Sequence, residues 1–343
     1  MLKRTLRRLS LPFGEPFATA RGVVAARDLL LLRLEDDDGA VGHGEAAPFE
    51  PYDGVPIDSI ARALVDADVS ADGCSRDLPP HARAAVEMAL LDLRARRDGR
   101  PVGEPGAEAI AVNRTLGAGP PEEVAGRARA GVRDGFSCFK LKVGLPDDAE
   151  RVAAVREAIG PWPALRLDAN GAWSTDEAIR TMSTLASYDI ELLEQPCATL
   201  SELAEVRAAL DVRIAADEPI ATAGDVERAA DARACDAINV KLAASGGFSG
   251  ARAAVRAATA CGLDPYLSST FDGPWGIAAS LQLAAAERIS LACGLATLEL
   301  FDARLARAVP PPSAGLQAVP QGPGLGVAVE EEALAEVVVE EIG

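Results

Sequence analysis

The central part of the chain alternates between short apolar runs and longer segments in which apolar residues recur with helical spacing. The short runs are rich in Val, Ile and Leu, as expected for parallel strands that are buried on both faces. Strands that alternate with helical segments indicate βαβ units, and a series of such units can close into a (β/α) barrel. We predict barrel strands two to six around residues 138–143, 164–169, 190–194, 212–217 and 236–242.

The flanking sequence supplies the other strands of this barrel. Residues 110–117 would form the first strand, 264–270 the seventh and 289–296 a shorter eighth. The three prolines at 309–313 end the barrel, because proline lacks the backbone donor that a continuing helix needs.

The N-terminal residues have a different pattern. Apolar runs at 29–34 and 41–45 flank an Asp-Gly turn, which predicts an antiparallel hairpin. The stretches 13–24 and 48–54 are interpreted as polar loops that contain Gly and Pro. A strong helical pattern follows at 81–97.

Together these patterns predict an α/β chain with a small α+β domain at residues 1–105 and a barrel at 106–313. The last segment, 314–343, contains a Gly/Pro turn and short apolar runs. We expect this segment to pack back on the N-terminal domain.

Composition narrows the class of protein. The chain carries 52 acidic and 34 basic residues, which gives a net charge of −18. This charge argues against nucleic acid or an anionic membrane as a partner, because phosphates attract clustered Lys and Arg. No apolar run approaches the roughly 20 residues that span a bilayer, and the six cysteines form no CxxC pair. We therefore expect a cytoplasmic protein with reduced thiols.

The chain has only two histidines, His43 and His81, and neither adjoins a motif. This argues against Ser-His-Asp or Cys-His nucleophilic catalysis and against a histidine-rich zinc site. Proton transfer must therefore fall to carboxylates or lysines.

Charged residues stand at the carboxyl ends of the five predicted strands, at intervals of 23 to 26 residues. Side chains in that register converge on the C-terminal face of a barrel, where barrel enzymes have their active sites. The pattern therefore predicts an active site. Its candidate residues are Lys140, Lys142, Asp168, Glu194, Asp217 or Glu218, and Lys241.

Three of these strands end in a carboxylate: Asp168, Glu194 and either Asp217 or Glu218. Three carboxylates close together repel one another, so we expect them to share a divalent cation. Ligation by oxygen alone favours Mg²⁺, with Mn²⁺ as an alternative. Strand alternation says only that Asp217 and Glu218 cannot both face inward.

Lys140 and Lys142 lie two residues apart, so both point to the same face of a strand. Burial disfavours the charged form of a lysine, which suits such a residue to act as a general base. Lys241 ends the sixth strand, across the barrel from the second. A substrate between Lys142 and Lys241 would be placed for removal of a proton α to a carboxylate. The metal and lysine charges would stabilise the resulting enediolate.

These motifs together resemble the enolase superfamily, in its muconate-lactonizing subgroup. KLK, LDAN, EQP, ADEP and NVKLAASGG occur in the family's order and spacing, and HGEAAP and GPGLGV extend the resemblance over nearly the whole chain. The resemblance implies a modified (β/α)7β TIM-like barrel with an α+β capping domain built from both termini. It also implies Mg²⁺ on Asp168, Glu194 and Asp217, with Lys142 as principal base, Lys241 as its opposite partner and Lys140 as an electrostatic helper.

The two ends of the pocket resemble different members of this subgroup. SLACGLATLELF on strand eight and PFEPYDG resemble o-succinylbenzoate synthases, whereas PFATARG and NVKLAASGG look more like dipeptide epimerases. The epimerases hold a substrate ammonium with an Asp-x-Asp pair on strand eight, and here those positions are apolar or Gly. The leading expectation is a synthase, a lyase of menaquinone biosynthesis that performs a syn dehydration. The alternatives are an isomerase that racemises N-acylamino acids or epimerises dipeptides, and a non-catalytic protein that binds small acids.

The loops beyond the strand ends contain candidate substrate-binding residues. Arg21 lies in the first loop, and arginine is the usual clamp for a substrate carboxylate. SSTFDGPWG would place Asp272 and Trp275 near the substrate, and GGFSG at 246–250 would form a tight turn rather than a phosphate-binding loop. We expect a small-molecule carboxylate as the substrate, and a homo-oligomer as one state of the protein. The substrate-binding set is Arg21, Asn113, Asn170, Ser268, Asp272 and Gly294.

Overall fold

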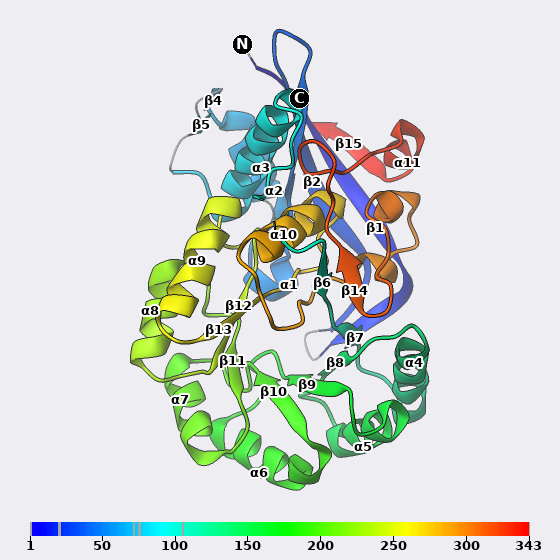
Figure 1. Ribbon diagram of the computed structural model, residues 1–343, viewed down its shortest axis with the longest axis vertical. Coiled ribbons are helices and arrows are strands. Elements are labelled where there is room, and N and C mark those ends of the chain that lie inside the picture. Colours follow the sequence, from blue (N-terminus) through cyan, green and yellow to red (C-terminus); the bar gives the residue numbers. More distant parts are fainter. Residues whose placement is uncertain (1, 20–21, 71–72, 75–76, 105, 343) are drawn as a thin grey trace.

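The structure is a computed structural model that describes residues 2–19, 22–70, 73–74, 77–104 and 106–342. Figure 1 shows a barrel whose strands are surrounded by helices, and above it a capping domain in which the blue N-terminal strands lie beside the red C-terminal strand. The predicted fold class, an α/β barrel with a capping domain from both termini, is confirmed.

The capping domain is built on an antiparallel sheet, in which four strands fall within the described residues. In spatial order they are β15 (Val338–Ile342), β1 (Lys3–Thr19), β2 (Gly22–Glu35) and β3 (Val41–Ala46). The other elements here are α2 (Ile57–Asp66), β4 (Val69–Ser70), β5 (Gly73–Cys74), α3 (Pro80–Arg97) and α11 (Glu331–Ala335).

Strand β2 is apolar on both faces because it lies between two cores. Leu29 and Leu31 belong to the core that continues into the barrel, whereas Leu30, Leu32 and Leu34 pack with α2 and α3. Since alternate residues of a strand point to opposite faces, a strand buried on both sides needs a continuous apolar run.

Strand β3 approaches helix α3 so closely that only glycine fits at the contact. A Cβ at Gly44 would lie 1.9 Å from the carbonyl oxygen of Ala85, and a Cβ at Gly42 would lie 2.1 Å from that of Ala89. A larger residue at either position would force the helix away from the sheet.

The predicted polar loop at 13–24 is wrong. Strand β1 continues to Thr19 and pairs with β2 beyond an irregularity between Pro12 and Phe17. Phe13 and Phe17 are both buried, so apolar contacts with the barrel hold this part of the strand in place. The Gly, Glu and Pro residues between them resemble a turn in the sequence, but they form a local irregularity of the strand.

The predicted loop at 48–54 also contains structure. Helix α1 (Glu50–Asp53) is a single turn that ends at Gly54, whose backbone is left-handed with φ 69°. Proline at the first turn is compatible with a helix because that position needs no backbone donor. The turn carries Tyr52 to the barrel, where its hydroxyl meets Asp217.

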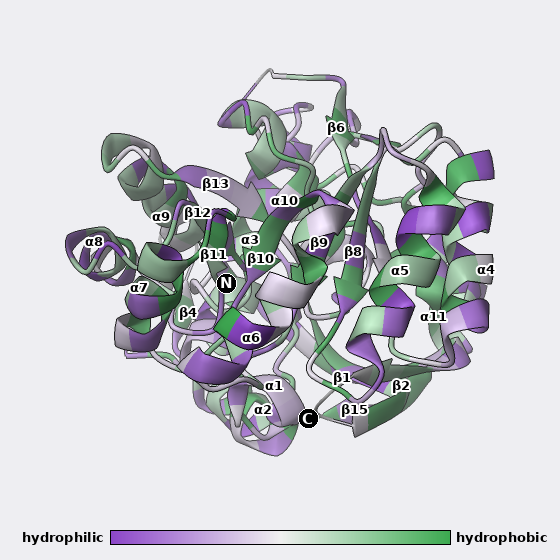
Figure 2. Cartoon of the chain, turned by 90° about the horizontal axis from the view of Figure 1, so that it is seen from below, coloured by the Kyte–Doolittle hydropathy of each residue, from purple (hydrophilic) through white to green (hydrophobic). Residues whose placement is uncertain are grey.

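The barrel sheet is parallel, with its described strands in sequence order, and helices of mixed hydropathy surround it (Figure 2). None of the helices in the described ranges is long and apolar enough to cross a membrane. The strands are β7 (Arg114–Leu116), β8 (Cys138–Lys142), β9 (Ala164–Asp168), β10 (Ile190–Glu194), β11 (Ile214–Ala216), β12 (Ala237–Val240) and β13 (Asp264–Leu267). The helices are α4 (Pro121–Arg133), α5 (Asp148–Ile159), α6 (Thr175–Leu185), η1 (Ala186–Tyr188), α7 (Leu200–Ala209), α8 (Ala223–Asp231), α9 (Phe248–Ala260), α10 (Pro274–Ala286), η2 (Leu298–Leu300) and η3 (Arg304–Ala308).

The first and eighth predicted strands differ from the structure. The stretch 110–117 is split: β6 (Ala109–Ala111) pairs with β14 (Leu316–Ala318), and only β7 joins the barrel sheet. Instead of a continuous strand at 289–296, two parallel bridges join Cys293 to Val112 and Gly294 to Ser268. These bridges link the two edges of the sheet and replace the eighth strand.

A carboxylate of the capping domain caps a barrel helix. Gly246 and Gly247 adopt φ 79° and 110° in the turn before α9, whereas residues 248–250 of the predicted tight turn already belong to that helix. The backbone amide of Ser249, in the first turn of α9, donates to Glu87 Oε1 at 3.1 Å. Glu87 comes from α3 and complements the positive end of the α9 dipole.

A second polar contact fixes the two domains to each other. The guanidinium of Arg27 donates to the carbonyl oxygens of Pro48 at 2.7 Å and Thr270 at 3.0 Å. Glu45 Oε1 accepts from the amide of Gly273 at 2.7 Å, just before α10. Both side chains are buried, so these contacts hold the segment before α1 and the loop after β13 together.

Candidate active site

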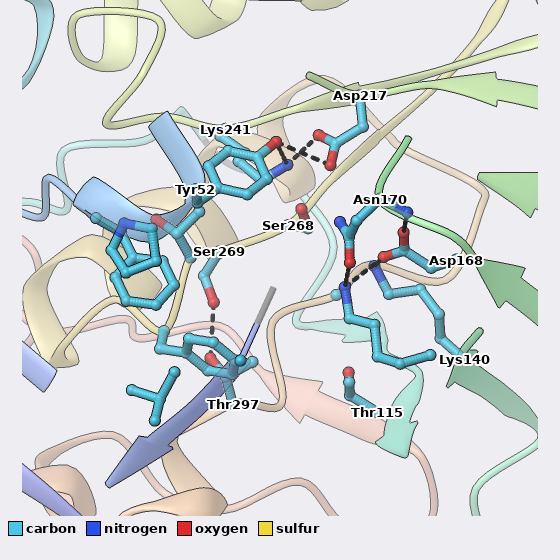
Figure 3. Close-up of a pocket in the computed structure, with 18 of the residues that line it drawn as sticks. Tyr52, Thr115, Lys140, Asp168, Asn170, Asp217, Lys241, Ser268, Ser269 and Thr297 are labelled. Atoms are coloured by element: carbon cyan, nitrogen blue, oxygen red, sulfur yellow. Dashed lines mark hydrogen bonds and ion pairs between the residues drawn. The ribbon is translucent and has the colours of Figure 1, made fainter. Parts of the chain in front are cut away.

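A cavity of about 130 Å³ lies at the C-terminal ends of the barrel strands, and Figure 3 shows its lining. The capping domain contributes residues 22–24 at the start of β2 and Phe49, Pro51 and Tyr52 around α1. The barrel contributes Thr115, Lys140, Lys142, Asp168, Asn170, Asp217, Lys241, Ser268, Ser269, Thr270, Phe271, Gly294 and Thr297.

The three predicted carboxylates stand at neighbouring strand ends. Asp168 and Glu194 are register partners at the ends of β9 and β10, and Asp217 follows directly after β11. They are 1 %, 0 % and 3 % exposed, so water screens their charges little. Burial raises the pKa of Glu194, and the negative charge of Asp168 raises it further. This repulsion is what an additional cation would relieve.

Lys140 lies between two of these carboxylates. Its Nζ is 3.0 Å from both Asp168 Oδ2 and Glu194 Oε1. Burial alone would lower the pKa of Lys140, but the charges of Asp168 and Glu194 outweigh burial and raise it. Burial would likewise raise the pKa of Asp168, yet Lys140 and Lys142 hold it below its usual range. Lys140 is thus a fixed cation.

Lys142 reaches the cavity two residues further along β8. Its Nζ donates to Asp168 Oδ2 at 2.6 Å and to Asn170 Oδ1 at 2.8 Å. The backbone of Asn170 is left-handed, with φ 47°, and its amide donates to Asp168 Oδ1 at 3.0 Å. The turn after β9 therefore presents two acceptors that orient the amino group of Lys142.

Lys241 follows β12 and forms an ion pair with Asp217 (Figure 3). Its Nζ also donates to the hydroxyl of Tyr52 at 2.8 Å, and that hydroxyl donates to Asp217 Oδ2 at 2.9 Å. The ammonium lies 4.7 Å from the centroid of the Tyr52 ring, within reach of a cation–π interaction. Glu218 accepts from Asn170 Nδ2 at 3.2 Å instead, so Asp217 and Glu218 meet different partners.

The donor set fits a hard divalent cation. In the part of the chain that the structure describes, no three acidic, His or Cys side chains are grouped closely enough to hold an ion as they stand. One ammonium nevertheless lies within 3.0 Å of both Asp168 and Glu194, so their oxygens can reach a single cation. The available donors are carboxylates, which Mg²⁺ prefers. Binding of Mg²⁺ by Asp168, Glu194 and Asp217 stays a prediction.

Three of the predicted substrate-binding residues, Asn170, Ser268 and Gly294, line the cavity. Asn113 is buried behind this wall: its backbone amide donates to Cys293 O at 3.0 Å, and its side-chain amide donates to Thr115 Oγ1 at 3.2 Å. Asn113 therefore supports the wall rather than lining it.

Asp272 and Trp275 are not among the described residues that line the cavity, and their contact with a substrate stays a prediction. The backbone amide of Thr270 donates to Asp272 Oδ1 at 3.2 Å, and burial raises the pKa of Asp272. Trp275 is fully buried and packs on His43 of the capping domain, with ring centroids 5.8 Å apart. Asp272 stands just before the N-cap of α10, and Trp275 lies in the first turn of that helix. Arg21 lies outside the described residues.

The structure also adds residues that the sequence argument missed. Ser269 Oγ and Thr297 Oγ1 lie 2.7 Å apart in the cavity wall. Phe271, with a left-handed backbone of φ 60°, packs edge-on against Phe17 and Phe49 of the capping domain, at centroid distances of 5.1 and 6.1 Å. No local sequence pattern marks these contacts. For Tyr52 the only signal was its place in PFEPYDG.

Strand-end lysines and carboxylates beneath a cap from both termini are the arrangement expected of a barrel enzyme. Residues 3–104 match the family described as Mandelate racemase / muconate lactonizing enzyme, N-terminal domain. Residues 123–333 match the one described as Enolase C-terminal domain-like. The chain therefore belongs to the mandelate racemase / muconate lactonizing enzyme family of the enolase superfamily.

Relatives with different activities resemble this chain. An o-succinylbenzoate synthase of Thermobifida fusca is 37 % identical over 297 residues, which cover 85 % of this chain and 81 % of the relative. An L-Ala-D/L-Glu epimerase of Bacillus subtilis is 33 % identical over 306 residues, or 82 % of this chain and 84 % of the relative. An N-succinyl Arg/Lys racemase from Bacillus cereus has the same fold, with a TM-score of 0.92 at 23 % identity and coverage of 99 % and 98 %. These relatives are named for different reactions.

Proposed function

We propose that this chain removes a proton α to a substrate carboxylate in a Mg²⁺-dependent reaction, and that it is an o-succinylbenzoate synthase. The observation that carries the proposal is the placement of Lys142 and Lys241 at the ends of β8 and β12, strands separated by three others in the sheet. Both amino groups reach the same cavity, so a substrate held there would have one lysine on each face.

Asp168, Glu194 and Asp217 would hold the Mg²⁺, which supplies positive charge to the substrate carboxylate when bound. Lys142 would take the α proton and deliver it to the leaving hydroxyl on the same face, so that water departs and the ring becomes aromatic. The geometry supports this role because the amino group of Lys142 points into the cavity from a fixed position.

Lys241 would contribute charge on the opposite face without moving a proton. Its ion pair with Asp217 and its contacts with Tyr52 support a fixed cation against the substrate ring. Lys140 would add positive charge below the reacting carbon, because it is buried beside Asp168 and Glu194.

The outer wall of the cavity supports the synthase among the family's reactions. Among the described lining residues, charged side chains occur only at the strand ends. The ammonium of a dipeptide would lose its hydration near Gly294 and Thr297 without gaining a carboxylate partner. An apolar ring would instead contact Val24, Phe49 and Phe271. The higher identity to a synthase than to an epimerase points the same way.

Racemisation of an N-acylamino acid is the second candidate, and the same two lysines favour it. A racemase needs a base on each face, and Lys142 and Lys241 are placed to serve in turn. An acyl group also removes the ammonium that the outer wall fails to pair. Epimerisation of a dipeptide is less favoured, because a dipeptide keeps the ammonium that the cavity wall does not pair.

Substrate turnover by the wild-type protein with Mg²⁺ tests the proposal. We expect dehydration of the cyclohexadiene substrate of the synthase to exceed racemisation of N-succinyl amino acids and epimerisation of dipeptides in kcat/KM. Faster racemisation with little dehydration would replace the synthase with the second candidate. Metal binding without turnover, and without exchange of the α proton in deuterated water, would leave a non-catalytic binding protein.

A further inference from the structure

Below the cavity, a continuous series of polar contacts leads to Glu194 through barrel residues that the mechanism above does not use. It begins at Glu191, which is partly exposed, and runs through Arg166 and Tyr266 to Glu194. Arg166 and Tyr266 are each 1 % exposed, although barrel interiors are usually filled by branched apolar side chains.

Tyr266 holds one oxygen of Glu194. Its hydroxyl donates to Glu194 Oε2 at 2.8 Å. Tyr266 in β13 is the register partner of Asn239 in β12, so both side chains point to the same side of the sheet. Asn239 Nδ2 donates to the other oxygen, Oε1, at 3.0 Å. Lys140 contacts both oxygens, at 3.0 and 3.1 Å.

Arg166 holds Tyr266 from the opposite side. Its guanidinium lies 5.4 Å from the centroid of the Tyr266 ring, within the range of a cation–π contact. Nε donates to Glu191 Oε2 at 2.5 Å, and Nη1 donates to the carbonyl oxygen of Ala292 at 2.7 Å. The guanidinium therefore cannot rotate freely. A cation against the ring also draws charge from the phenol, which makes the hydroxyl a stronger donor.

We propose that Tyr266 is a positioning residue for Glu194, and that Arg166 acts on Glu194 through the Tyr266 hydroxyl. This inference rests on the proposed function, in which Glu194 is a ligand of Mg²⁺. A carboxylate can bind a cation through either oxygen or both, and partners behind the ligand decide which oxygen is free and how it points. Tyr266 holds Oε2 and Asn239 holds Oε1, so the two contacts fix the plane of the Glu194 carboxylate. Its oxygens then face the position that the Lys140 ammonium now shares with Asp168.

Tyr266→Phe tests whether Tyr266 positions Glu194, because it removes the hydroxyl and leaves the ring on Arg166. We expect the dissociation constant for Mg²⁺, measured by calorimetry without substrate, to rise about 10- to 100-fold, the usual effect of losing such a partner. Electron paramagnetic resonance of bound Mn²⁺ should show the same weakening, and saturating Mg²⁺ should restore most of kcat. Tyr188→Phe, outside the barrel interior, is the matched control and should bind Mg²⁺ like the wild type.

Unchanged or tighter metal binding by Tyr266→Phe would overturn the inference. If the wild type itself binds no Mg²⁺, the proposed function fails instead, so the two failures are distinguishable. A purely structural role for Tyr266 predicts a lower unfolding temperature with an unaltered dissociation constant, which would also count against the inference.

A double-mutant cycle tests whether Arg166 acts on Glu194 through the Tyr266 hydroxyl. Arg166→Lys keeps the charge but loses the planar contact with the ring, and it should weaken Mg²⁺ binding roughly threefold to tenfold. Combined with Tyr266→Phe, it should add nothing further, because residues that act through one group are not additive. Equal effects in both backgrounds would show that Arg166 acts independently. If Arg166→Lys fails to fold, Glu191→Gln at the partly exposed end of the series serves in the same cycle.

Discussion

Leu32 in the capping domain and Arg166 in the barrel are almost equally inaccessible to solvent, at 0 % and 1 % exposed. The surroundings of the two residues differ completely. Leu32 packs among apolar side chains between the sheet and helices α2 and α3. Arg166 lies in a barrel interior that also buries Lys140, Glu194 and Asp168, each with an oppositely charged partner.

The two kinds of buried side chain contribute differently to folding stability and to catalysis. Full burial of a leucine side chain contributes about 1.5–3 kcal/mol to folding. A buried ion pair returns little, because the attraction between the charges hardly exceeds their cost of desolvation. The buried charges of the barrel interior therefore add little to folding stability, but they are held in place before a substrate arrives. Apolar packing in the capping domain and between the barrel strands and their helices stabilises the fold instead.

The largest effect is expected at the cavity, from Lys142→Arg. Guanidinium cannot act as a base near neutral pH, so kcat for dehydration should fall by about 10²- to 10⁴-fold, the usual contribution of a general base. The unfolding temperature should change little, because the charge is kept. Steady-state kinetics and thermal unfolding measure the two quantities.

Lys241→Arg is the matched variant on the other face. In a synthase Lys241 need only supply positive charge, so measurable dehydration should persist. In a racemase each lysine must move a proton, and either variant should then stop racemisation. Loss of dehydration in both variants would contradict the roles assigned to the two lysines.

The apolar core should respond in the opposite way. Leu32→Ala should lower the free energy of unfolding by about 2–5 kcal/mol, because it leaves a cavity among packed side chains. The kcat of the folded variant should match that of the wild type, since the core cluster of Leu32 includes none of the described residues that line the cavity. Urea unfolding measures the loss. Leu316→Ala, at a half-exposed position, should change the stability by less than about 0.5 kcal/mol.

Glu45 lies between the two regions and should give the protein a pH-dependent stability. Burial raises the pKa of Glu45 to about 8, and the charge of Asp272 adds to the shift. An unfolded glutamate titrates near about 4.3. Between these two pH values the folded state holds a proton that the unfolded state has lost. This contribution is therefore complete at low pH and is lost as pH rises toward about 8.

Glu45→Gln should reduce this pH dependence. The wild type should lose on the order of 1 kcal/mol of unfolding free energy per pH unit between about pH 5 and 8 from this group. The variant should show a flatter profile, because its amide does not titrate in this range. Urea unfolding at four pH values measures both profiles. Parallel slopes would mean that Glu45 does not titrate as stated.

The contrast between apolar and polar interiors also explains which strands and site residues could be predicted from the sequence. Repeating patterns placed the strands β8 to β12, because each parallel strand buried on both faces leaves a continuous apolar run. The charged strand ends were predicted for a related reason: Lys142, Asp168 and Glu194 end such runs at one register. The polar interior at Arg166 lies within the run and carries no comparable signal.

The errors occur where long-range contacts outweigh local pattern. The segment 13–19 contains turn-forming residues but becomes strand, because Phe13 and Phe17 are buried against the barrel. The eighth strand is reduced to bridges at Cys293 and Gly294, since it pairs with ends that only the closed barrel brings near. Trp275 follows a strand-seven loop, but it lies in the first turn of α10 and packs on His43 of the capping domain.

Tyr52 was missed for the same reason, and Tyr52→Phe is expected to have the smallest effect of the series. Its hydroxyl bridges Lys241 and Asp217 from the capping domain. Removing it should lower kcat/KM about threefold to tenfold, the equivalent of one hydrogen bond of 0.5–1.5 kcal/mol. The loss stays small because the ion pair of Lys241 with Asp217 remains, and a phenyl ring still faces the ammonium. Tyr188→Phe controls for the loss of a hydroxyl elsewhere. A loss above about 100-fold would instead give the Tyr52 hydroxyl a part in the proton transfer, and an unchanged rate would show that Lys241 needs no support from the capping domain.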